Sequence, residues 1–421
     1  MNEQVLWIWL SLACTPGNEN FRKLFSNFAS VKAIYEADEN ALGAIVGTRT
    51  NDLTALSDKN TDKAEEIFEY CNKKKIGILN YGDPSFPRSL REISNPPVLL
   101  YYRGIVPDFD KIFCVSVVGT RRLSEYGLKN AFSISRDLAG AGATVVSGMA
   151  LGVDGVAHAG ALSIGGITIA VLGSGIDVCY PADHKLLARE IVKEGCVFTE
   201  YAPGTKPERN NFPKRNRIIS ALSRATLVIE GKEKSGALIT ARYALDQNRV
   251  LYALPGNVGN SNSEFTNLLI KNGAKLCVSA DDIVRDFEQD SQGILNPFEL
   301  AKIEKIDPYD ALKRFSVSAV TANDPIFRRT KKAVDKSAMK RKTEVKDENS
   351  VVEGVTTPVM DGFDAETLEI YKRIPQKGEC TIESLVDSKL SLRKVMKGLL
   401  RLEMGRFVVM LPGEKVKRAF E

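Results

Sequence analysis

The chain has 421 residues, of which 43% are hydrophobic and 26% charged, and its net charge is +5 at pH 7. This length exceeds what one hydrophobic core usually organises, so we expect several domains. No apolar run reaches the roughly 18 residues of a membrane span, so we expect a cytoplasmic protein with no membrane partner. The seven cysteines are scattered along the chain, which argues against a disulfide framework and a zinc site. With only two histidines, a metal site or a catalytic triad is also not expected.

Positive charge is concentrated in particular segments. Residues 328–346 contain nine Lys and Arg against Asp335 and Glu344, and residues 393–418 contain eight against Glu403 and Glu414. Such clustering is typical of nucleic-acid-binding proteins. For 328–346 alone, a solvated disordered tail explains the charge equally well.

Residues 1–75 show apolar residues at helical spacing, including Phe21, Leu24, Phe25 and Phe28, and predict a small helical domain. Residues 76–110 form a proline-rich lead-in. From Ile112 onward, short apolar runs alternate with helix-length segments joined through glycine, which predicts an α/β domain over 76–287: a Rossmann-like, mostly parallel sheet with helices on both faces. The expected strands are 113–118, 144–146, 168–172, 197–199, 226–229 and 250–254.

Residues 288–360 are polar and charged, and we expect a disordered linker there. Order returns over 361–421, where helices at 365–372, 381–387 and 392–403 and a strand pair at 405–411 match a winged-helix pattern. The helix 392–403 gathers leucines on one face. Its cationic residues, which are possible DNA contacts or simply the solvated face of an amphipathic helix, are Arg393, Lys394, Lys397 and Arg401.

Glycine turns follow two of the predicted strands: Gly119-Thr120-Arg121 and the turn at Gly148. In open α/β sheets, ligands bind outside the carboxyl ends of the strands. Glycine permits a tight turn, free backbone N–H groups at a helix start attract anions, and Arg121 adds a bidentate phosphate donor. We expect these residues to bind phosphate, with a plain strand-to-helix turn as the alternative. His158 we expect to be a buried structural histidine.

Residues 210–219 combine cations, amides and one aromatic ring. Phe212 is predicted to stack on an unpaired base, while Lys214, Arg215 and Arg217 neutralise phosphates from a basic loop. The alternative is a loop with Phe212 turned inward. Another turn, Ser235-Gly236, opens a helix after strand 226–229 and is expected to join the phosphate-binding edge. There is no G-x-x-x-x-G-K-[ST] and no G-x-G-x-x-G in these turns, so we expect no nucleotide cofactor.

Together these motifs resemble the DprA/Smf family of DNA-processing proteins from about Tyr81 to Ile283. The family normally has serine where this chain has Thr120, so a hydroxyl is kept. The motifs that carry the resemblance are Gly82-Asp83-Pro84, Asn95-Pro96-Pro97, Val118-Gly119-Thr120-Arg121, Ser147-Gly148, Ala157-His158, Gly173-x-Gly175-x-Asp177-x-x-Tyr180-Pro181, Phe212-Pro213-x-Arg215-Asn216-Arg217, Ser235-Gly236-x-Leu238-Ile239-Thr240-Ala241 and Pro255-Gly256.

The resemblance implies a non-enzymatic, homodimeric protein that binds single-stranded DNA and loads RecA recombinase in natural transformation. It also implies an N-terminal domain of sterile-alpha-motif type and a C-terminal winged helix. Two alternatives remain open. A Rossmann-like hydrolase that cleaves a base from a ribose phosphate would need a carboxylate such as Asp154, Asp177, Glu200 or Glu230. A transcriptional regulator would read duplex DNA through the winged helix and sense a nucleotide. The basic-aromatic segment 212–217 favours the single-strand binder, because a small nucleotide does not require it.

Overall fold

The computed structural model describes residues 2–48, 50–232, 236–318, 364–376, 378–388, 390–404, 407–411 and 415–419. The chain divides into two compact units. One comprises Met1–Ile270 and Ala274–Ala319, and the other comprises Lys271–Gly273 and Val320–Glu421.

The first unit begins with a helical region, as the sequence predicts. Its helices are α1 (Glu3–Ala13), α2 (Asn20–Asn27), α3 (Val31–Glu36), α4 (Glu39–Val46), α5 (Asn51–Ser57) and α6 (Asp62–Lys74). The Ser30, Asp38 and Thr50 side chains cap α3, α4 and α5 by accepting a backbone N–H of the first turn. α1 is buried from Val5 to Leu10 and packs against α3, α5 and α6, so it is the central helix of this region.

A mostly parallel sheet follows, which confirms the predicted fold class. The strands are β1 (Gly77–Asn80), β2 (Leu99–Gly104), β3 (Phe113–Val118), β4 (Ala143–Ser147), β5 (Thr168–Val171), β6 (Cys196–Thr199), β7 (Ala225–Val228), β8 (Val250–Ala253) and β9 (Lys275–Leu276). In the described residues they lie in the order β1-β2-β6-β5-β4-β3-β7-β8-β9. β1 and β2 are antiparallel, with Ile78 opposite Tyr101, and β2 is antiparallel to β6. The strands β1 and β2 both lie in the lead-in, where the sequence pattern predicts no strand.

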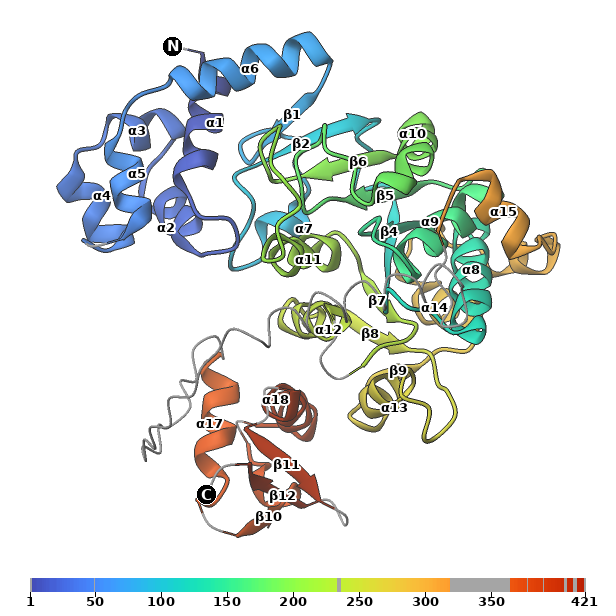
Figure 1. Ribbon diagram of the computed structural model, residues 1–421. Coiled ribbons are helices and arrows are strands. Elements are labelled where there is room, and N and C mark those ends of the chain that lie inside the picture. Colours follow the sequence, from blue (N-terminus) through green and yellow to red (C-terminus); the bar gives the residue numbers. More distant parts are fainter. Residues whose placement is uncertain are drawn as a thin grey trace, which may run out of the picture. The chain divides into compact units, whose positions relative to one another are not determined.

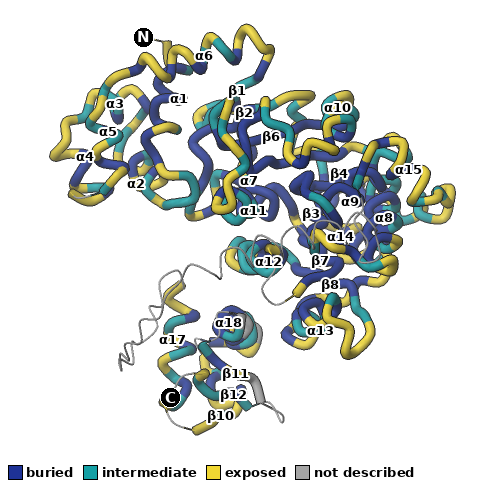
Figure 2. Tube along the Cα trace, in the orientation of Figure 1, coloured by how far each residue is buried: buried dark blue, intermediate teal, exposed yellow. Residues whose placement is uncertain are grey.

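Helices cover both faces of the sheet (Figure 1). The helices are α7 (Arg88–Arg91), α8 (Glu125–Gly140), α9 (Val153–Ser163), α10 (Lys185–Glu194), α11 (Asn211–Ala221), α12 (Gly236–Asp246), α13 (Glu264–Lys271) and α14 (Ala280–Phe287). α8 packs on α9 and α14, and α9 on α10, whereas α11 packs on α12 and α7. Strands that are covered on both faces need apolar residues throughout, which is why β3 is buried at every position (Figure 2).

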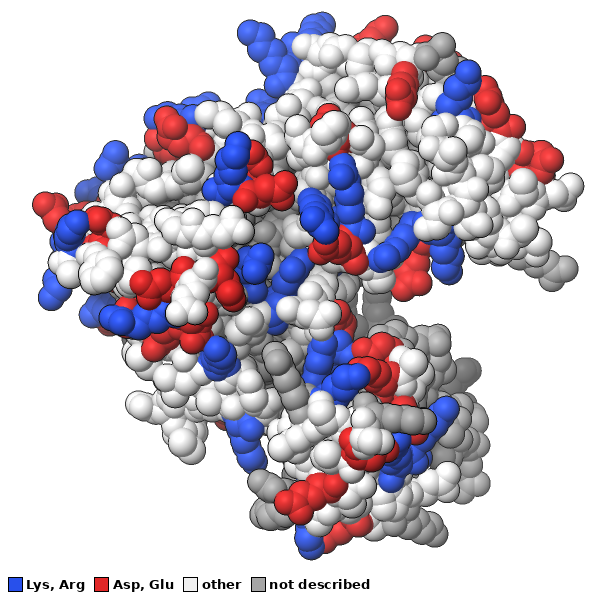
Figure 3. All heavy atoms as spheres, turned by 180° about the vertical axis from the view of Figure 1, so that it is seen from behind, with Lys and Arg blue, Asp and Glu red and all other residues white. Residues whose placement is uncertain are grey.

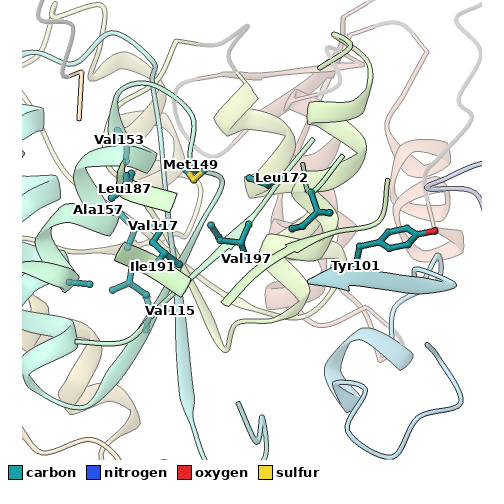
Figure 4. Packing of buried hydrophobic residues seen from close by; sticks show 14 of the residues in the cluster. Tyr101, Val115, Val117, Met149, Val153, Ala157, Leu172, Leu187, Ile191 and Val197 are labelled. Atoms are coloured by element: carbon teal, nitrogen blue, oxygen red, sulfur yellow. The ribbon is translucent and has the colours of Figure 1, made fainter. Parts of the chain in front are cut away.

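The packing of this core is visible around β3 (Figure 4). Val115 and Val117 of β3, Val153 of α9 and Ile191 of α10 are all fully buried in one cluster. The close fit of β3 to α9 fixes the loops that leave these elements at the carboxyl edge of the sheet.

The expected linker begins later than predicted. Residues 297–302 and 308–314 form the 3₁₀ helix η2 (Pro297–Lys302) and the helix α15 (Pro308–Arg314), and α15 packs against α8 and α9. Leu295, Leu312 and Phe315 are buried in the main core. A few well-placed apolar residues therefore anchor a segment whose average composition is polar. The rest of the predicted linker, residues 319–360, lies outside the described residues.

The second unit contains α17 (Ala365–Arg373), β10 (Glu379–Thr381), η3 (Glu383–Leu385), α18 (Leu392–Met404), β11 (Val408–Leu411) and β12 (Lys415–Arg418). Its strands pair antiparallel in the order β10-β12-β11 among the described residues. Ile370, Val395, Leu399 and Val416 are fully buried in its core. The helix predicted over 381–387 is wrong, because residues 379–381 pair with β12 and only a 3₁₀ turn follows.

Across the described ranges, no helix is both long and apolar enough to cross a membrane.

Candidate nucleic-acid interface

The carboxyl ends of β3, β4 and β7 lie side by side at one edge of the sheet. β3 leads into α8 and the neighbouring β7 into α12, and these two helices belong to the opposite helical layers. Crevices form in α/β sheets where the chain leaves adjacent strands towards opposite faces. A pocket of about 450 Å³ lies there, and we call it the switch-point pocket. Its lining includes Gly119, Thr120, Arg121, Arg122, Ala150, Asp154, Arg209, Phe212, Arg215, Asn216 and Gly236.

The turn after β3 is held tightly against its neighbours. A Cβ atom at Gly119 would lie 2.5 Å from Val153 Cγ2 and 2.9 Å from the Glu230 carbonyl oxygen, so only glycine fits. The Thr120 N–H donates to that same carbonyl at 2.7 Å and is not free for a phosphate. The Thr120 hydroxyl oxygen accepts the Arg122 N–H at 3.1 Å, which closes the turn.

Arg121 and Arg122 are both exposed cations of this turn. The Arg121 guanidinium lies over the Phe212 ring, with 5.2 Å between the guanidinium carbon and the ring centroid. Among the described residues the Arg121 side chain makes no hydrogen bond or ion pair. Arg121 lines the pocket, and its N–H donors have no hydrogen-bond acceptor in the described part of the chain, as a phosphate contact requires.

Arg215 forms the buried floor beside Gly148. Its Nη1 donates to the Gly148 carbonyl at 2.8 Å and to the Val171 carbonyl, and the side chain is 3% exposed. A Cβ at Gly148 would lie 2.4 Å from Arg215 Nη2 and 2.6 Å from Asp154 Oδ2. Burial lowers the pKa of Arg215 to about 10, so it remains cationic at neutral pH and makes the pocket wall positive from below.

The segment 212–217, expected as a loop, forms the first turns of α11. Pro213 is tolerated because first-turn N–H groups have no partner within a helix. Phe212 is half-buried, and its ring centroid lies 5.5 Å from that of Tyr180. The Phe212 ring therefore contacts both Arg121 in the turn after β3 and Tyr180 in the loop after β5.

The sequence profile of the DNA recombination-mediator protein A family matches residues 77–288, which include all the sheet strands of the first unit and every lining residue named above. The chain belongs to this family. It is similar to the Smf protein of Synechocystis, with 36% identity over 313 residues, 73% of this chain and 77% of the relative. It is 42% identical over 227 residues to the DNA processing protein DprA of Streptococcus pneumoniae, covering 54% of this chain and 79% of that one. The crystal structure of DprA from the same species superposes with a TM-score of 0.60 at 33% identity, covering 68% of this chain and 99% of that one.

In this member of the recombination-mediator protein A family, three predicted phosphate contacts do not line the switch-point pocket: Gly148, which is buried, Lys214 and Arg217. Arg217 is fully buried, and its Nη2 donates to Glu200 Oε1 at 2.6 Å while its Nε donates to the Asn95 carbonyl. It cannot reach a phosphate and is not part of the interface that we propose below. Lys214 is half-buried, and its aliphatic stem lies 3.4 Å from the position that a Cβ would take at Gly17.

The third predicted turn is only partly described. Ser235 lies outside the described residues. Gly236 begins α12, is exposed and lines the switch-point pocket. A Cβ at Gly236 would meet no atom of the described residues within 4 Å, so no described side chain covers the first turn of α12 there. Its N-terminal N–H groups carry the positive end of the helix dipole.

The start of α8, by contrast, is already occupied by an anion of the protein. The Ser124 N–H donates to Glu230 Oε2 at 2.9 Å, the Ser124 hydroxyl bonds the other Glu230 oxygen, and the same hydroxyl caps α8 at Gly127. Glu230 is 1% exposed. The expectation that the turn after β3 offers a helix N-terminus to phosphate is therefore wrong, because Glu230 takes that place.

The residues weighed for chemistry have structural partners. His158 is fully buried and its Nδ1 lies 2.7 Å from the Thr168 hydroxyl, as a structural histidine requires. Asp154 is largely buried beside the pocket, and burial raises the pKa of its carboxyl group. Within the described part of the chain, no group of three or more His, Cys, Asp or Glu side chains is arranged to hold a metal ion.

The cations predicted on α18 differ in their surroundings. Arg401 is 5% exposed and bonds Asp364 and the Thr367 hydroxyl, so it ties α18 to the start of α17 and is not a solvent-facing contact. Lys394 donates to Glu366 at 2.7 Å and is half-exposed. Lys397 lies on the same helix, and Arg393 does too, although its side chain is not described.

Two features of this region escaped sequence reasoning. Arg209 lines the pocket from the exposed stretch before α11, and Tyr180 lies beside Phe212. Tyr180 belongs to the motif Gly173-x-Gly175-x-Asp177-x-x-Tyr180. The motif does not indicate, however, that Tyr180 lies beside Phe212.

Proposed function

We propose that this chain binds single-stranded DNA without sequence preference at the switch-point pocket. We further propose that it protects incoming DNA and loads RecA recombinase in natural transformation, as a cytoplasmic homodimer that catalyses no reaction itself. The observation that carries the proposal is the convergence of three distant segments, the turn after β3, the start of α11 and the start of α12, on one pocket.

The charge of the pocket suits a phosphate backbone. Among the described residues, the cations that line it are Arg121, Arg122, Arg209 and Arg215, and Asp154 contributes one carboxylate. Arginine binds phosphate through planar, bidentate N–H pairs, and aromatic rings beside such cations favour unpaired bases. A pocket of about 450 Å³ accommodates a nucleotide, while a duplex would keep its bases paired and out of reach.

On the face seen in Figure 3, the described Lys and Arg side chains are interspersed with Asp and Glu. Affinity at this site depends mainly on the cations that line the pocket. The names of the family and of its DNA-processing relatives support DNA as the ligand. The proposals that RecA receives the strand and that the chain forms a homodimer rest on the family resemblance.

The domain assignments belong to the same proposal. Residues 1–75 form a domain of sterile-alpha-motif type, and the extended Rossmann-like domain predicted as 76–287 continues to residue 318. Residues 361–421 form a winged helix, whose elements are α17, α18 and the β10-β12-β11 sheet. Arg393, Lys394 and Lys397 remain candidate contacts of that domain.

Binding to matched single- and double-stranded oligonucleotides, measured by electrophoretic mobility shift with unlabelled protein, tests the function. We expect preference for single strands of any sequence, with log K falling linearly in log salt by about 0.7 for each phosphate neutralised. Preference for duplex, or an affinity that does not change with salt, contradicts the proposal.

A further inference from the structure

Tyr180 is an exposed aromatic residue beside the switch-point pocket. It lies in the loop between β5 and the 3₁₀ turn η1 (Ala182–His184), and 42% of its surface is accessible. Its ring centroid is 5.5 Å from that of Phe212, at an interplanar angle of 49°. Within the described residues its hydroxyl group has no hydrogen-bond partner. The Tyr180 side chain is therefore not held in place by a hydrogen bond to a described residue. Part of its ring is exposed to solvent.

The Phe212 ring, by contrast, is surrounded by protein. A Cβ placed on Gly173 would lie 3.0 Å from Phe212 Cδ1 and 3.2 Å from Cε1, so the Gly173 backbone lies directly against the ring. The Arg121 guanidinium carbon lies 5.2 Å from the ring centroid and that of Arg215 lies 5.9 Å from it. With two cations, a tyrosine and a backbone segment around it, this half-buried ring leaves little surface for an incoming base.

We propose that Tyr180, and not Phe212, is the ring on which an unpaired base stacks. Phe212 is a positioning residue that holds the Arg121 guanidinium at the pocket through a cation–π contact. Both neighbours flank the same ring, so a phosphate at Arg121 and a base at Tyr180 can belong to one stretch of strand. This inference rests on the proposed function, because it assigns separate roles within the same interface.

The two roles predict different dependence on the bases and on salt. Stacking requires a base, so its loss should matter only for strands that carry bases. A displaced phosphate contact should matter for any strand and should reduce the salt dependence, because fewer counterions are released.

The experiment compares the full chain on oligo(dT) and on an equally long strand of abasic deoxyribose phosphates, each over a salt series. The variants are Tyr180→Ala, Tyr180→Phe and Phe212→Ala. Tyr309→Ala is the control, since Tyr309 is 47% exposed and lies on α15. Thermal unfolding of each variant confirms that it is folded.

Tyr180→Ala should weaken oligo(dT) binding by about 5- to 150-fold, with an unchanged salt slope and unchanged affinity for the abasic strand. Tyr180→Phe should bind as the unaltered chain does, and so should the Tyr309 control. Phe212→Ala should weaken binding to both strands and reduce the magnitude of the salt slope by up to about 0.7.

The inference is overturned if Tyr180→Ala binds oligo(dT) normally or loses equally on both strands. It is also overturned if Phe212→Ala loses affinity only for the strand that carries bases. Failure of the proposed function has a different signature: the unaltered chain then binds neither strand, or binds both independently of salt.

Discussion

Replacing Arg121 by alanine isolates one guanidinium of the proposed interface. Its side chain is exposed and lies 5.2 Å from the Phe212 ring centroid, and within the described residues it makes no hydrogen bond or ion pair. Loss of that exposed cation–π contact costs about 0.5–1 kcal/mol of folding stability at most. Loss of a charge-assisted hydrogen bond to phosphate costs about 1.5–3 kcal/mol of binding free energy. The variant should thus remain folded and bind single-stranded DNA roughly 10- to 150-fold more weakly.

Fluorescence anisotropy with a labelled single strand at fixed salt measures this loss, and urea denaturation measures the stability. Arg224→Ala is the matched control, because Arg224 is an exposed arginine that precedes β7 at the opposite, amino edge of the sheet. The control should bind within about twofold of the unaltered chain, since an exposed side chain away from the interface has little effect. Normal DNA binding by Arg121→Ala, or equal losses in both variants, would refute the assignment of phosphate to the turn after β3.

Further predictions concern residues whose roles the structure separates. Arg217→Met leaves the buried Glu200 carboxylate without its partner and should lower the free energy of unfolding by about 3–5 kcal/mol in urea denaturation; an unchanged midpoint would contradict the buried ion pair. Glu230→Gln should destabilise the fold by about 1–3 kcal/mol through weaker bonds to the start of α8, with DNA affinity unchanged; lost binding at normal stability would instead place Glu230 in the interface. Burial works to raise the pKa of Asp52, but hydrogen bonds from three polar side chains outweigh it and the pKa is lowered, so Asp52 contributes stability above its unfolded pKa of about 3.9 that disappears as pH falls through the folded value. Asp52→Asn should therefore lose less stability on acidification, and identical acid sensitivity of the two proteins would argue against this. Incubation with nucleoside monophosphates should release no free base, detected by chromatography; release that disappears in Asp154→Asn would favour the hydrolase alternative.

The periodicity of the sequence was sufficient to predict the contiguous parallel strands from β6 to β8 in the sheet order. Strand β3 begins and ends where predicted, and the other predicted strands agree within about two residues. A parallel strand covered by helices needs an unbroken apolar run, and glycine follows it where the chain turns sharply, as at Gly119. These are local requirements, so they are readable along the chain. The antiparallel strands β1 and β2 were less predictable, since their pairing depends on register between segments whose own patterns are short.

The roles of the charged residues were decided only by the tertiary structure. Arg121, Arg215 and Arg217 look alike in the sequence, yet one is exposed, one bonds backbone carbonyls beneath the pocket and one pairs with Glu200. Glu230 bonds Ser124, 106 residues earlier in the chain, and takes the helix start that the motif alone offers to a phosphate. A guanidinium or carboxylate is stabilised by whichever partner the fold brings within hydrogen-bond distance, and burial makes such a partner obligatory. Spacing along the sequence carries no information about a partner a hundred residues away, so the pattern predicts the edge where a ligand binds and the fold selects which side chains remain free to bind it.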